Sequence, residues 1–141
     1  MTDIQLKPGA GRVLLMTLVA AVAAVLVNNV YSIAYTAATG FSIPEVINPV
    51  SVSMFSAAPV ILGGIIYLIA SRFSVKVANW GLVIGTVAMF VMLTIPTFGE
   101  MIQTPTLAEP IPAPDGFVGL SLGLHFAGPV FLLWLVPSWK N

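Results

Sequence analysis

The amino-acid sequence predicts an all-α integral membrane protein, a four-helix bundle with both termini in the cytoplasm. Of its 141 residues, 58% are hydrophobic and only 7% are charged, and the mean hydropathy is +1.03. A soluble domain has roughly a quarter of its residues charged. The chain also contains four apolar runs close to the roughly 20 residues that a helix needs to cross a bilayer. We therefore expect a single membrane domain over residues 1–141.

The first expected span covers residues 13–36, after a short polar arm whose proline and glycines should prevent an earlier helix start. A cleaved signal peptide is the rival interpretation, because Lys7 and Arg12 precede an apolar segment. Asp3, within the same arm, favours a retained span instead.

The second and third spans are expected over residues 51–71 and 77–98, and the short connection between them predicts an antiparallel hairpin. Four prolines follow in the segment 99–116, which predicts an extended extracytoplasmic loop without regular structure. The fourth span, residues 117–137, carries the only histidine, His125.

The charged residues predict the orientation, because Lys and Arg are enriched in cytoplasmic loops. With four spans, every cation falls on one side of the membrane and most carboxylates fall on the other. The cations are Lys7, Arg12, Arg72, Lys76 and Lys140, and the opposing carboxylates are Glu45, Glu100, Glu109 and Asp115. The membrane expected is the bacterial cytoplasmic membrane, with the Pro-rich loop outside.

Three polar residues lie inside the expected spans at a common depth. Asn28, Asn29 and His125 are each seven or eight residues from the outer end of their span, about 10–12 Å below the surface. An unsatisfied polar group in hydrocarbon costs several kcal/mol, so these side chains should turn inward. Further polar residues in the outer half of the bundle complete this candidate cluster: Ser53, Ser56, Thr94, Ser121 and, at its mouth, Glu100.

Two interpretations of this cluster stay open. It forms an outward-facing pocket for a ligand, a proton or a pigment, or it is a set of hydrogen bonds that holds the helices in register. Ligation of a tetrapyrrole metal by His125 is a third, less favoured idea, since four-helix haem proteins generally use paired histidines. No other cofactor and no metal are expected.

Two small-residue pairs are spaced for close helix packing. Gly81 and Gly85 form one pair, and Gly119 and Gly123 form the other. We expect both to serve first in packing within the chain and second as a docking face. Pro59 and Pro129 should kink the second and fourth spans, because proline removes a helical hydrogen bond.

The sequence lacks the residues that several classes of function require. The chain has no cysteine, no basic cluster for a nucleic-acid partner, no carboxylate in the first span of the kind that small multidrug exporters use, and no signature of nucleotide binding or hydrolysis. We therefore do not expect an enzyme.

The segments VKVANWGLVIGTVAMFVMLTIPTF and GLHFAGPVFLLWLVPSW resemble a family of small bacterial four-helix membrane proteins known only as a domain of unknown function. The matching positions are Trp80, Thr94, His125 and Pro137, and the resemblance covers about half of the chain. It implies the four-helix architecture and no activity.

The function expected from these observations is that of a non-enzymatic accessory or scaffold subunit in a larger membrane complex, such as a respiratory or photosynthetic one. Its partners would be the lipid bilayer and other membrane subunits. The alternative is a small transporter or ligand-binding membrane protein that uses a pocket around Asn28, Asn29 and His125.

Overall fold

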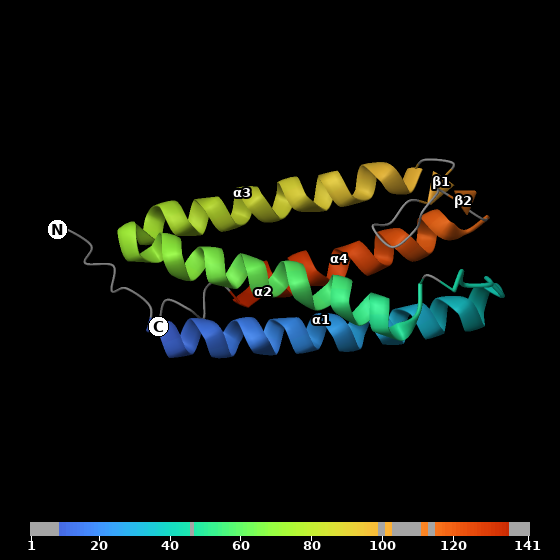
Figure 1. Ribbon diagram of the computed structural model, residues 1–141, viewed down its shortest axis with the longest axis horizontal. Helices are drawn as coiled ribbons and strands as arrows, with labels where there is room; N and C mark the ends of the chain where they lie inside the picture. Colours follow the sequence, from blue (N-terminus) through green and yellow to red (C-terminus); the bar gives the residue numbers. More distant parts are fainter. Residues whose placement is uncertain (1–8, 46, 99–100, 103–110, 113–114, 136–141) are drawn as a thin grey trace.

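The computed structural model of the chain describes residues 9–45, 47–98, 101–102, 111–112 and 115–135. Within these residues it is an antiparallel bundle of four α-helices, in which neighbours along the chain run in opposite directions (Figure 1). The helices are α1 (Ala10–Thr39), α2 (Pro49–Phe73), α3 (Val75–Thr94) and α4 (Phe117–Leu135).

Helix α1 extends beyond the predicted span at both ends. It begins directly after its N-cap Gly9. Gly11 therefore lies in the first turn, where backbone N–H groups have no helical partner in any case. It ends at Gly40, which has a φ of 70° and donates its backbone N–H to the carbonyl of Thr36. This left-handed conformation strongly favours glycine, so Gly40 stops the helix.

Helix α2 has a well-defined start. The Asn48 side chain accepts hydrogen bonds from the backbone N–H groups of Val50 and Ser51, and the Ser51 hydroxyl bonds back to Asn48. Pro49 occupies the first helical position, where its missing N–H costs nothing. The helix continues through Pro59 to Phe73.

The predicted hairpin between α2 and α3 is present, with Ser74 as the single residue between the helices. Helix α3, however, ends earlier than predicted. It stops at Thr94 and continues as a short 3₁₀ helix, η1 (Ile95–Phe98), because Pro96 cannot donate to the α-helical ladder.

The Pro-rich segment also departs from the prediction of a loop without regular structure. Strand β1 (Met101–Ile102) pairs with strand β2 (Ile111–Pro112) in a short antiparallel ladder. Residues 103–110 between the strands lie outside the described part of the chain. The pairing needs a partner eleven residues away along the chain, which the local proline pattern does not indicate.

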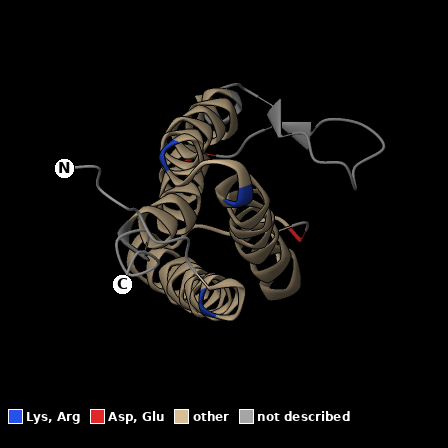
Figure 2. Ribbon diagram, turned by 90° about the vertical axis from the view of Figure 1, so that its left-hand side faces the viewer, with Lys and Arg blue, Asp and Glu red and all other residues tan. Residues whose placement is uncertain are grey.

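Charge is divided between the two ends of the bundle. The described cations Arg12, Arg72 and Lys76 lie in terminal turns at one end, which faces the viewer in Figure 2. The described carboxylates, Glu45 and Asp115, lie in connections at the other end. Lys7, Lys140, Glu100 and Glu109 are outside the described residues.

Helices α1, α2 and α3 are each long and apolar enough to cross a membrane, which indicates a multi-pass integral membrane protein. The described side chains of α4 cover Phe117–Leu133, an apolar stretch just below that length. Large apolar residues are exposed along the outside of the bundle, such as Ile33, Ile66 and Ile84. This surface suits a lipid environment.

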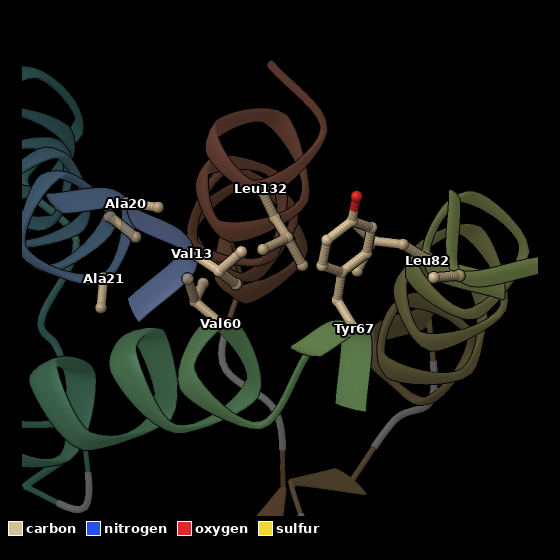
Figure 3. Close-up of a cluster of buried hydrophobic side chains, with 9 residues drawn as sticks. Val13, Ala20, Ala21, Val60, Tyr67, Leu82 and Leu132 are labelled. Atoms are coloured by element: carbon tan, nitrogen blue, oxygen red, sulfur yellow. The ribbon is translucent and has the colours of Figure 1, made fainter. Parts of the chain in front are cut away.

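The larger of two core clusters lies between all four helices in the half of the bundle that holds the cations, and a smaller one around Phe41, Phe117 and Leu120 lies at the other end. Val13 and the buried alanines of α1 pack against Val60 and Tyr67 of α2, with Leu82 and Leu132 closing the cluster (Figure 3). Gly64 of α2 brings α1 close, because a Cβ at this position would overlap the side chain of Thr17.

Candidate functional site

Asn28 is the centre of the polar cluster, and it joins three helices. Its side chain on α1 is almost fully buried, at 2% exposure. The amide nitrogen donates hydrogen bonds to the Ser56 hydroxyl of α2 at 2.6 Å and to the Leu124 carbonyl of α4 at 2.8 Å. Ser56 in turn donates to the Val52 carbonyl of its own helix. Asn28 therefore fixes the register of α1 against both neighbours.

Asn29 has a smaller role, because it faces only α2. Its amide nitrogen donates to the Val25 carbonyl within α1 and to the Ser53 hydroxyl at 3.1 Å. Ser53 is also bonded to the Pro49 carbonyl. The two asparagines thus donate to two serines of α2, Ser56 and Ser53, that lie one helical turn apart.

Two tyrosines of α1 hold the first turns of α4. The hydroxyl of Tyr31 donates to the Gly119 carbonyl and that of Tyr35 donates to the Gly116 carbonyl, both at 2.7 Å. The rings lie where side chains of α4 would otherwise be, since a Cβ at Gly119 would press on Tyr35 and one at Gly123 would overlap Tyr31. The glycine pair of α4 therefore packs within the chain.

His125 is placed differently from the asparagines. Its side chain is partly buried, and its Nδ1 atom is buried and forms no hydrogen bond to the described part of the protein. The Oδ1 atom of Asn28 is likewise buried without such a partner. The structure connects Asn28 to the backbone beside His125, at Leu124, and not to the imidazole itself.

Three further residues were predicted to belong to the cluster. Ser121 is buried on α4, one turn before His125. Thr94 is the last residue of α3, where the helix changes to η1. Glu100 lies outside the described residues, so its predicted place at a pocket mouth stays a prediction.

The glycine pair of α3 is not packed, which corrects the expectation of intrachain packing. A Cβ at Gly81 or Gly85 would meet no atom of the described residues within 4 Å. Both glycines instead line a hollow between α2 and α3. Helix α3 does approach α4 farther along, where the rings of Phe90 and Phe126 meet edge to face at 6.0 Å between centroids.

Two hollows lie on the surface of the bundle, and both are almost wholly apolar. The larger, of about 600 Å³, runs along the outer face of α4, with Phe90, Phe126 and Phe131 among its lining residues. The smaller, of about 260 Å³, is the one between α2 and α3. Neither is lined by Asn28, Asn29 or His125, although Tyr31 lines the larger one.

This arrangement limits the chemistry of the cluster. Amides, hydroxyls and one imidazole can donate and accept hydrogen bonds, but no carboxylate joins them in the part of the chain described. Over the same residues, no group of three or more His, Asp and Glu side chains could hold a metal ion. Tetrapyrrole ligation by His125 gains no support from the two hollows, because the imidazole lines neither.

Sequence reasoning missed four polar contributors. Tyr31 and Tyr35 could have been identified from the sequence, because they lie one helical turn apart on the same helix as Asn28. Tyr67 and Asn79 form a further interhelical bond, between α2 and α3, in which the tyrosine hydroxyl donates to Asn79 Oδ1 at 3.0 Å. Each is a polar residue within an apolar run, which is the signal that identified Asn28.

Fold and cluster together define the class of protein: an α-helical bundle whose long apolar helices are joined by buried hydrogen bonds. Comparison with known proteins assigns no family to it. No protein-family model matches the chain, and neither the curated proteins nor the solved structures contain one similar to it.

Proposed function

We propose that the chain is a non-enzymatic accessory or scaffold subunit of a larger membrane assembly, such as a respiratory or photosynthetic complex. In this proposal α4 is the fourth span, both termini are cytoplasmic, and the membrane is the bacterial cytoplasmic membrane. The division of the described charges between the two ends supports this orientation, since cations accumulate on the cytoplasmic side.

One observation carries the proposal. Asn28 and Asn29 donate hydrogen bonds to serine hydroxyls of α2 within the bundle, while two hollows on its surface are lined almost wholly by apolar side chains. A transporter needs a solvated path to its polar residues, whereas a scaffold needs rigid helices and an apolar exterior that other subunits and lipids can cover. The bundle has the second combination.

The decisive experiment is native-size analysis with mass spectrometry after mild detergent extraction from the source membrane. The proposal expects the chain to migrate with stoichiometric partner subunits, whose identities would name the assembly. Migration as a monomer or a small homo-oligomer would contradict it. If the chain is a subunit, His125→Ala should lower only the amount of assembled complex. If it is instead a transporter, the same substitution should abolish transport.

A ligand-binding or transport function is the second candidate, and the two unpartnered buried atoms favour it. Asn28 Oδ1 and His125 Nδ1 both lie within the bundle without a hydrogen bond among the described residues. A ligand or proton that supplied those bonds would be held at about the same depth on α1 and α4. The site would consist of Asn28, Asn29 and His125.

The single histidine makes these two functions separable. Diethyl pyrocarbonate added to sealed proteoliposomes modifies a solvated imidazole, and mass spectrometry can locate the adduct at His125, provided the protein is purified without a histidine tag. The scaffold proposal expects modification only after unfolding in detergent. Rapid modification of the folded protein would instead support the ligand-binding candidate. The resemblance of α3 and α4 to a four-helix family of unknown function stays a prediction.

A further inference from the structure

The hollow between α2 and α3, here called the α2–α3 slot, is the feature that the proposed function leaves unused. Its walls are Leu62, Gly63 and Ile66 of α2, and Gly81, Gly85 and Met89 of α3. Leu132 of α4 also lines it, and Gly63 lies against this leucine. The slot is thus closed on the bundle side by packed side chains and bounded on α3 by two bare glycines.

The dimensions of the slot fit one extended hydrocarbon chain. Its lining on α3 runs from Val77 to Met89, which is about 18 Å at 1.5 Å per residue. The whole slot holds about 260 Å³ over that length.

Positive charge lies at one end of the slot. Ala70 and Val77 line this end, where α2 and α3 meet at Ser74. Arg72 and Lys76 are within two residues of these positions, and both are exposed. Figure 2 shows this end of the bundle with described cations only, since Glu45 and Asp115 lie at the opposite end. A negative headgroup is therefore favoured here over a neutral one.

We propose that the α2–α3 slot is a binding site for an anionic phospholipid. One acyl chain lies along Gly81 and Gly85, and the phosphate group lies at the level of Arg72 and Lys76. The inference rests on the proposed function only in that the helices span a membrane, and it needs no partner subunit. Basic residues at the cytoplasmic side of spanning helices attract anionic lipid headgroups.

The test uses the full chain in vesicles of equal parts phosphatidylglycerol and phosphatidylcholine with matched acyl chains. Trace spin-labelled lipid of either type reports, by electron paramagnetic resonance, the fraction immobilised by the protein. The wild-type protein should immobilise phosphatidylglycerol preferentially. The double variant Arg72→Gln/Lys76→Gln should lose several-fold of this preference, because each basic residue contributes a factor of about five at an anionic surface.

Two control variants separate a site from general surface charge. Arg12→Gln removes one cation from the same end but lies on α1, away from the slot, and should keep most of the preference. Gly81→Leu/Gly85→Leu should fill the slot and lower the immobilised fraction of both lipids, while Val87→Leu, exposed on α3 outside the slot, should not. Because a Cβ at either glycine meets no atom, the filled variant should fold normally.

Three results would overturn the inference: unchanged preference in the Arg72/Lys76 variant, an equal loss in Arg12→Gln, or undiminished lipid immobilisation when the slot is filled. Alkaline carbonate extraction of the same vesicles separates this failure from a failure of the premise that the helices span the membrane, and native-size analysis tests the subunit proposal by itself. Protein that resists extraction but shows no lipid preference refutes the lipid site alone. Protein released by carbonate refutes the membrane-spanning proposal as well.

Discussion

The contact between α1 and α4 and the contact between α2 and α3 carry the same sequence motif in opposite structural settings. Gly119 and Gly123 of α4 lie directly under tyrosine rings of α1, whereas Gly81 and Gly85 of α3 face open space. The first contact also carries interhelical hydrogen bonds from Asn28 and both tyrosines. The second is joined by the turn at Ser74 and by the Tyr67–Asn79 bond.

The difference teaches that glycine spacing permits close packing without requiring it. A helix approaches a glycine pair when the neighbouring helix has a group that fits there, and α1 supplies two tyrosines whose hydroxyls find backbone carbonyls. Helix α2 presents Leu62 and Ile66 along the α2–α3 slot, and these leave the glycines of α3 uncovered. Four pairs of substitutions test this contrast.

The largest effect is expected for Gly123→Leu. The new side chain must displace the ring of Tyr31, and overpacking of this kind costs about 1–3 kcal/mol and occasionally more; the direct overlap places this variant at the upper end. Reversible unfolding in mixed micelles, followed by circular dichroism, would measure the loss. The matched control is Gly85→Leu, which adds the same side chain in open space and should change stability little. Equal destabilisation by both variants would contradict the contrast.

Asn28→Ala should have the next largest effect. It removes hydrogen bonds to both α2 and α4 from a fully buried position, which should lower the free energy of unfolding by about 1–3 kcal/mol. Asn29→Ala is the control, because Asn29 is only partly buried and reaches one neighbouring helix. Its cost should be near 0.6 kcal/mol, the average for such bonds in membranes. A larger cost for Asn29 than for Asn28 would refute the ranking.

Tyr31→Phe should cost about 0.6 kcal/mol, since it removes only the hydroxyl that donates to the Gly119 carbonyl. Tyr35→Phe should behave alike, because its bond to Gly116 has the same length. The readout is amide hydrogen exchange in the first turns of α4, which should quicken in both variants. Unchanged exchange there would show that ring packing, and not the hydroxyls, holds α4.

The only stabilising effect, no larger than about 1 kcal/mol, is expected for Gly85→Ala. Alanine costs less conformational entropy than glycine in a helix, by roughly 0.5–1 kcal/mol, and its methyl group meets no atom here. A higher midpoint of unfolding in the same micelles would confirm it. Destabilisation would mean that something covers this face of α3 in micelles, contrary to an open slot. Gly123→Ala, tested beside it, should be destabilising because of Tyr31.

The existence of the four helices was predictable because it depends on local chemistry. The apolar runs, the short connection between the second and third of them, and the position of Asn28 within the first can all be derived from residue spacing. The end of α3 at Thr94 was harder to predict from the sequence. Helices α2 and α4 continue through Pro59 and Pro129, whereas α3 ends just before Pro96. Whether a proline ends or merely interrupts a helix depends on what surrounds it.

By itself, the sequence determined the apolar helices, the division of charge between their ends, and the need of every polar side chain within them for a hydrogen bond. Only the tertiary structure decided which bonds those are. Asn28 reached Ser56 and Leu124 but not His125, and the glycines of α4 found tyrosines while those of α3 did not. The physical reason is rotation about the helix axis: a helix apolar on all sides has no preferred inward face, so contacts with its neighbours set which residues meet.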